Sequence, residues 1–337
     1  MIAAPLPEGV HKIRIPLTGS PLGWVNGYVL KSDDGFVLVD CGWDLPDALE
    51  ALRKGLDELD IKLEDLRTLV ITHNHPDHYG LAGRLVKLAS CGLLMHHLDA
   101  VHIESRYVNM ESLEAEMERW IRIHGAPGDE VLAMVRGSHA ILERINIAKP
   151  DIEVSGGEKI AAGGLEWQII WTPGHSLGHI CLYEPRIKAF MSGDHILNPI
   201  SPSIGLHAQS MGNPLSDYLS SLDSIRDLDV ETVLPAHGDQ FVGYRERIDE
   251  LMEHHEERLQ EIVRIIERVG EQTAYETASQ MKWNLEGPFA DWPPFMRRMA
   301  MMEALAHLEL LVSRRGLRRQ TADGGLVRYA AAKASED

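Results

Sequence analysis

The stretch Val70–Gly80, VITHNHPDHYG, decides how the rest of the chain is interpreted. It places three histidines and one aspartate within six residues, directly after an apolar run. His73 and His75 are two residues apart, so in an extended segment both side chains point the same way. The proline that follows bends the chain, and Asp77 and His78 begin the next helix facing a neighbouring point. This short segment can therefore supply ligands to two metal ions.

Four apolar segments each run directly into a potential metal ligand. TLVIT ends at His73, WQIIWTPG at His175, AFMSG at Asp194 and TVLPA at His237. In α/β sheets ligand sites gather where strands end, so these four positions can converge. Each histidine alone would more often be a loop residue with a backbone partner, but their joint placement at strand ends favours a shared site. Imidazoles and carboxylates without thiolates suit zinc first, with iron or manganese as alternatives, and argue against a closed structural zinc.

The length and the cysteine pattern narrow the class of protein. A chain of 337 residues suggests one large domain plus a smaller one. No apolar run approaches the roughly 20 residues that a membrane span needs, and the N-terminus lacks the features of a signal peptide. Cys41, Cys91 and Cys181 are scattered without a CxxC pair, which is typical of reduced thiols. We therefore expect a cytoplasmic protein without membrane contact.

The net charge argues against a nucleic-acid partner. At −18 it repels polyanions at long range. A local exception is the basic run of Arg314, Arg315, Arg318 and Arg319, which we interpret as a solvated face.

Short predicted strands and helices alternate through the first two thirds of the chain, which is typical of an α/β fold. The strand signals stop over 96–149, where two helices separated at Gly125–Gly128 are predicted. We expect this helical insertion to cover the metal face and shape the substrate pocket. The alternative is a helical pair that braces a dimer or the tail of the chain.

The chain changes character after Gly243. A long amphipathic helix is predicted over Tyr244–Val269 and a second helix over about 294–315. A β-hairpin around Asp323-Gly324 follows, so the tail resembles a small winged-helix domain. The predicted domains are therefore a catalytic domain over 1–243, including the insertion, and a helical, winged-helix-like domain over 244–337.

Taken together, the motifs resemble the metallo-β-lactamase superfamily over roughly residues 10–243. The matching segments are HNHPDH at 73–78, TPGHSLGH at 172–179, SGD at 192–194 and PAHG at 235–238, in the order of that family. The resemblance implies an αββα sandwich. It also implies the metal ligands: His73, His75 and His175 for the first ion, Asp77, His78 and His237 for the second, and Asp194 as the bridge.

One more residue matches a family position. Asp40, in VLVDCG, is similar to a residue that supports the ligands from behind. The alternative is an aspartate that caps the next helix. His75 stands where flavodiiron members carry a glutamate, which argues against that branch of the family.

The expected activity is that of a dinuclear metal-dependent hydrolase. A hydroxide bridging two divalent ions would attack the carbonyl of a small acyl compound, with Asp77 orienting it and moving a proton. The segment 193–205 and the tail resemble glyoxalase II-like and β-lactamase-like members, which implies a glutathione or coenzyme A thioester. Lactones are the second choice, since an alkoxide leaves less readily than a thiolate and benefits from an acid such as Tyr79 or Tyr218, either of which could instead be a packing residue.

Two further functions compete with this hydrolase. A ribonuclease of the same fold would share the motif, although the net charge of −18 argues against it. A metal-stabilised binding module without activity is the other alternative. No membrane or nucleic-acid partner is expected, and a homodimer is possible.

Overall fold

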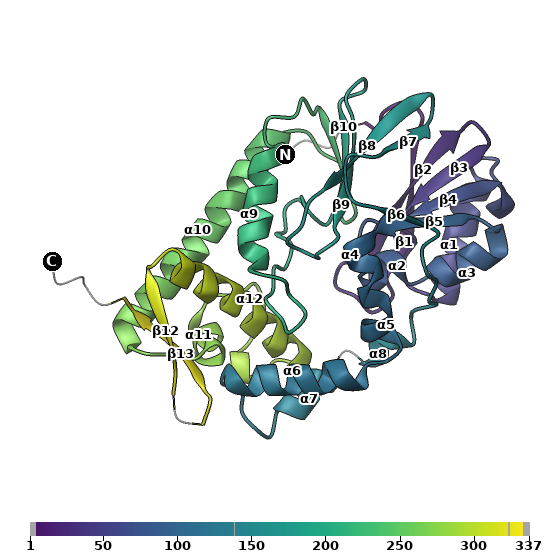
Figure 1. Ribbon diagram of the computed structural model, residues 1–337. Coiled ribbons are helices and arrows are strands. Elements are labelled where there is room, and N and C mark those ends of the chain that lie inside the picture. Colours follow the sequence, from purple (N-terminus) through teal and green to yellow (C-terminus); the bar gives the residue numbers. More distant parts are fainter. Residues whose placement is uncertain (1–4, 138, 323, 333–337) are drawn as a thin grey trace. The chain divides into compact units, whose positions relative to one another are not determined.

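The computed structural model describes residues 5–137, 139–322 and 324–332 (Figure 1). They form two compact units that interleave along the chain. The first comprises Met1–Val108, Ala140–Pro202 and Ser221–Ile248. The second comprises Asn109–His139, Ser203–Ser220 and Asp249–Asp337.

The first unit contains a six-stranded sheet in which neighbours in sequence are neighbours in space. Its strands are β1 (Val10–Pro16), β2 (Trp24–Ser32), β3 (Gly35–Val39), β4 (Leu66–Val70), β5 (Gly92–His96) and β6 (Ile152–Val154). The pairs β1–β2 and β2–β3 are antiparallel, whereas β3 to β6 run parallel. The crossovers between the parallel strands carry the helices α1 (Pro46–Asp57), η1 (Leu63–Asp65), α2 (Pro76–Tyr79), α3 (Ala82–Ala89), α4 (His97–Ala100), α5 (His102–Tyr107) and α8 (His139–Leu142).

A five-stranded sheet completes the strand layers of this unit. It comprises β11 (Thr232–Pro235), β10 (Ala189–Gly193), β9 (Ile180–Glu184), β8 (Leu165–Trp171) and β7 (Lys159–Ala162), in that spatial order. All of its pairs are antiparallel except β10–β11. The helix α9 (Pro214–Ile225) connects β10 to β11.

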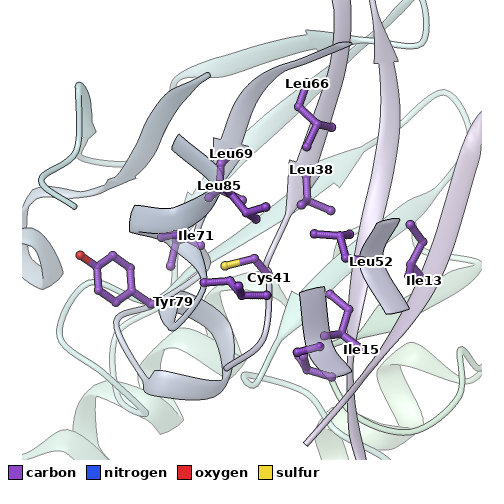
Figure 2. Packing of buried hydrophobic residues seen from close by; sticks show 14 of the residues in the cluster. Ile13, Ile15, Leu38, Cys41, Leu52, Leu66, Leu69, Ile71, Tyr79 and Leu85 are labelled. Carbon is purple, nitrogen blue, oxygen red and sulfur yellow. The ribbon is translucent and has the colours of Figure 1, made fainter. Parts of the chain in front are cut away.

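Alternating side chains of the first sheet build two separate cores. Leu38 packs with Leu52 of α1 and Leu85 of α3 on the helical side (Figure 2). Its neighbours Val37 and Val39 point the other way and pack between the two sheets. Successive side chains of a strand face opposite sides, so one strand serves both cores. Burial of each such aliphatic side chain stabilises the fold by about 1.5–3 kcal/mol.

Helices also cover the outer face of the second sheet. The ring of Phe190 in β10 lies 5.2 Å from that of Tyr244, the first residue of α10 (Tyr244–Val269). The Tyr244 hydroxyl donates a hydrogen bond to the carbonyl of Ile225 at the end of α9. The order of layers is helix, sheet, sheet, helix, so the predicted αββα sandwich of the α/β class is confirmed.

The second unit is mainly helical. It contains α6 (Glu111–Ile123), α7 (Val131–Arg136), most of α10, α11 (Ala274–Gln280), η2 (Phe289–Asp291) and α12 (Pro294–Ser313), with a hairpin of β12 (Leu317–Thr321) and β13 (Val327–Ala331). The predicted tail helices and hairpin are present, whereas Asp323 at the hairpin tip lies outside the described residues. The resemblance of this tail to a winged-helix domain stays a prediction.

The predicted helical insertion is divided between the two units. Arg298 of α12 donates to the carbonyl of Met134 in α7 at 2.8 Å, and Tyr275 of α11 donates its amide to His124 at the end of α6. The helices α6 and α7 therefore pack against the tail helices, as the bracing alternative describes. Residues 97–107 remain with the first unit. The predicted domain limits of 1–243 and 244–337 stay a prediction.

The basic run of the tail is exposed to solvent. Arg314 pairs with Glu256 at 3.2 Å and Arg319 with Glu309 at 3.1 Å. These four arginines form a solvated face, as predicted. Among the described residues, no helix has both the length and the apolar character needed to cross a membrane.

Candidate metal centre

The predicted ligands follow the ends of four strands of the first unit. His73 comes shortly after β4, His175 after β8, Asp194 directly after β10 and His237 after β11. Asp77 and His78 lie in the single turn of α2, which begins at Pro76. The structure brings all seven predicted ligands together, in three overlapping groups whose ligand atoms lie within 4.8 Å of one another.

Three histidines form the first group. His75 Nδ1 lies 3.0 Å from His73 Nε2 and 2.9 Å from His175 Nε2. The three ring nitrogens thus converge on one point from two different loops, which is how imidazoles surround a divalent cation.

The second group consists of Asp77, His78 and His237. Asp77 Oδ2 lies 3.4 Å from His237 Nε2 and 3.8 Å from His78 Nε2. Asp194 faces both groups: its Oδ2 is 3.5 Å from His175 Nε2, and its Oδ1 is 3.5 Å from the Nε2 atoms of His78 and His237.

Unsatisfied buried atoms show that this donor set fits a metal. His78 Nε2, His237 Nε2 and Asp194 Oδ1 are buried without a hydrogen-bond partner. The other ring nitrogens are engaged: His78 Nδ1 binds Asp40 Oδ2 at 2.8 Å, and His237 Nδ1 donates to the carbonyl of Trp24 at 2.9 Å. Buried polar atoms are rarely left unpaired, and a histidine that binds a metal usually donates its second nitrogen in this way. The cluster therefore fits a divalent cation.

The electrostatics separate the histidines into two kinds. Burial, together with the neighbouring imidazole of His78, holds the pKa of His73 well below its ordinary value. Burial also lowers the pKa of His78, but the nearby carboxylates, led by Asp194, outweigh it and hold that pKa well above the ordinary value. The carboxylates thus place negative charge where a cation would lie, and burial lowers the pKa of His75 as well, so His73 and His75 present neutral imidazoles, the form that binds metals.

Asp40 supports the ligands from behind. Its carboxylate is buried and accepts hydrogen bonds from the Thr72 amide at 2.9 Å and the Thr72 hydroxyl at 2.8 Å, as well as from His78. Its φ of 60° is uncommon for a residue other than glycine, and these bonds maintain it. The alternative of a helix cap is wrong, because α1 has Leu45 at its N-cap position and no side-chain cap.

His179 is a residue of the site that the motif contained but to which we assigned no role. It is fully buried, and its Nε2 accepts the Asp194 amide at 3.1 Å while its Nδ1 lies 2.9 Å from the Thr172 hydroxyl oxygen. A Cβ atom on Gly193 would lie 2.7 Å from His179 Nε2, so only glycine allows this approach. The second histidine of the TPGHSLGH motif is the sequence feature that could have identified His179 as part of the site.

The two candidate tyrosines are packing residues. The Tyr79 hydroxyl donates a hydrogen bond to the Ala148 carbonyl and accepts one from the Ala148 amide at 2.8 Å. Burial raises the pKa of Tyr79 to about 12. Tyr218 is buried in the second unit with its ring edge-on to His255 at 5.4 Å.

Comparisons with known proteins agree with this geometry. The model of the family described as the metallo-beta-lactamase superfamily matches residues 22–237. The probable metallo-hydrolase YqjP of Bacillus subtilis is 26% identical over 314 residues, covering 90% of this chain and 92% of its own. A beta-lactamase-like protein 2 homolog of Caenorhabditis elegans is 30% identical over 148 residues, 44% of this chain and 45% of its own. A crystal structure of a metallo-beta-lactamase family protein from Thermus thermophilus is similar with a TM-score of 0.82 and 30% identity, over 96% of this chain and 98% of that one.

Proposed function

The chain belongs to the metallo-beta-lactamase superfamily, and from that premise we propose that it hydrolyses small acyl compounds at a dinuclear metal centre, with thioesters preferred. That it is a metallo-hydrolase of this fold agrees with its similarity to YqjP along nearly the whole length of both chains. The number of ions, the substrate and the roles of single residues belong to the proposal.

The second ligand group carries the dinuclear part of the proposal. A single ion on His73, His75 and His175 would leave His78 Nε2 and His237 Nε2 buried without partners. A second ion held by Asp77, His78 and His237 would satisfy both nitrogens and the unpaired oxygen of Asp194, which faces both groups.

Two divalent ions held there would lower the pKa of a shared water and polarise a substrate carbonyl. Asp77 Oδ2, 3.4 Å from His237 Nε2, then lies where it can orient that water and accept its proton. Asp40 holds the ring of His78 through its Nδ1 atom, so that Nε2 remains directed at the site.

Two observations support a thioester. Tyr79, the tyrosine beside the metal loop, has its hydroxyl committed to the backbone of Ala148, so it does not offer an acid for the alkoxide of a lactone. A thiolate, with a thiol pKa near 8.5, leaves without such an acid. Arg106 also places a positive charge beside the metal loop, where it donates to the Asn74 side chain at 2.9 Å, which suits a negatively charged conjugate such as that of glutathione or coenzyme A.

Metal content and turnover test the proposal together. We expect two divalent ions per chain by elemental analysis, and hydrolysis of acyl-thioesters faster than of lactones by the zinc-loaded protein. The His73→Ala variant is the control, because it removes one ligand of the first group. No turnover above this control in either panel would refute the proposed activity, whereas cleavage of single-stranded RNA would favour the ribonuclease.

A further inference from the structure

A buried carboxylate outside the ligand set joins the two loops that carry the first ligand group. Asp99 lies in α4, directly after β5, and is 1% exposed. Its Oδ2 accepts the amide of Asn74 at 2.8 Å and the hydroxyl of Ser176 at 2.9 Å. Its Oδ1 accepts the amide of Gly178 at 2.7 Å.

These three partners lie within or beside the ligand positions. Asn74 stands between His73 and His75, and Ser176 follows His175 directly. One carboxylate thus binds the loop after β4 and the loop after β8, which lie 25 and 79 residues away in the sequence.

Asn74 is held at each of its polar groups. Besides its amide, its side-chain nitrogen donates to the Asp99 carbonyl at 3.1 Å. Its side-chain oxygen accepts from Arg106 at 2.9 Å, and its carbonyl accepts from the Tyr107 hydroxyl at 2.6 Å. The segment 97–107 therefore fixes the position of the residue that separates two ligands.

The second loop is shaped to meet Asp99. A Cβ atom on Gly178 would lie 2.6 Å from the Asp99 amide nitrogen and 2.9 Å from its Cβ. Only glycine lets this loop lie against α4 closely enough for the 2.7 Å hydrogen bond.

The ligand nitrogens of the first group meet from both loops. His75 Nδ1 lies 3.0 Å from His73 Nε2 in its own loop and 2.9 Å from His175 Nε2 in the other loop. This convergence requires the two loops to be held at a fixed spacing, which contacts outside the ligand set provide. We infer that Asp99 is a positioning residue that presets the first ligand group by clamping its two loops, an inference that rests on the metal function proposed above.

The experiment measures zinc affinity, which does not depend on knowing the substrate. Asp99→Asn leaves one acceptor oxygen for donors on both sides of the carboxylate. In a His237→Ala background, which lacks a ligand of the second group, the Asp99→Asn substitution shows its effect on zinc affinity at the first group. In a His175→Ala background it shows its effect on zinc affinity at the second group. Each protein is titrated against a chromophoric chelator, and the melting temperature of the metal-free form is recorded.

Glu184→Gln is the matched control. Glu184 is also 1% exposed and also accepts two backbone amides, those of Glu166 and Arg186, but it lies at the opposite end of β9 from His179. Ser176→Ala is a milder variant that removes one of the three bonds and keeps the carboxylate.

We expect Asp99→Asn to weaken zinc binding at the first group by about 10- to 100-fold and to leave the second group unchanged. Ser176→Ala should weaken the first group less, and Glu184→Gln should lower only the melting temperature. Asp99→Asn behaving like Glu184→Gln, with both zinc affinities intact, would overturn the inference. Should Asp99→Asn not fold, full zinc affinity in Ser176→Ala would overturn it instead. Failure of the unaltered protein to bind zinc would reject the metal centre itself.

Discussion

Replacing Asp40 with asparagine should weaken metal binding at the second ligand group. The carboxylate accepts from His78 Nδ1 on one side and from the Thr72 amide on the other. Asparagine has a single oxygen, so one of these donors must face an NH₂ group. With His78 facing it, the ring loses the bond that keeps its proton on Nδ1, and a proton on Nε2 would block that ligand atom.

The structure sets the size of this effect. A hydrogen bond to a charged group contributes about 1.5–3 kcal/mol, and about 1.4 kcal/mol corresponds to a tenfold change in affinity. The zinc affinity of the second group should therefore fall roughly 10- to 100-fold, measured by chelator competition in the His175→Ala background. Glu184→Gln serves again as the control for loss of a buried carboxylate. Unchanged zinc affinity in Asp40→Asn would refute the assigned role of Asp40.

Three further outcomes follow from the same contacts. Compared with protein that has metal present at about a hundred times its dissociation constant, the chelated protein should melt roughly 5–10 °C lower. An unchanged calorimetric transition would contradict metal binding to the folded state. Burial, with Arg319 nearby, lowers the pKa of His124 from 6.5 to about 4. As the pH falls from 7 to 5, the unfolded state therefore takes up the proton first, and the free energy of unfolding decreases. The His124→Phe variant should make this decrease smaller by about 2 kcal/mol. Urea unfolding at both pH values measures this, and parallel pH profiles for the two proteins would rule it out. Gly193→Ala should weaken zinc binding, because the new Cβ would lie 2.7 Å from His179 Nε2 at a backbone φ of 50°; Gly324→Ala, with open space at its Cβ and a φ of 84°, is the control for backbone strain and should bind zinc normally.

The ligands could be predicted because their signals are local. His73, His75, Asp77 and His78 share one segment, and each remaining ligand follows an apolar strand that is recognisable in the sequence. Strand ends meet at one edge of a sheet, so position along the strand already predicts proximity. The alternation of strands and helices indicates an α/β fold, and the αββα arrangement is what the resemblance of the motifs to the family implies.

The residues that hold the ligands could not be predicted in the same way. Asp99 contacts its loops across 25 and 79 residues, within a segment that the sequence marked only as helical. Hydrogen bonds of this kind depend on tertiary proximity, which has no periodic signature. The packing partner of α6 could not be predicted for the same reason. An amphipathic face indicates that one side of a helix is buried but does not identify the element that buries it.

The supporting contacts also determine how folding and metal binding are coupled. The Nδ1 atoms of His78 and His237 already have partners in Asp40 and the Trp24 carbonyl, and His73 Nδ1 lies 3.1 Å from the Thr72 hydroxyl. These rings are therefore oriented by the protein, and the two apolar cores of the sandwich are built from side chains outside the proposed ligand set. In small metal-dependent folds the ion supplies the folding free energy. Here the two apolar cores supply it instead, so metal removal should lower stability while leaving the sandwich folded at 25 °C.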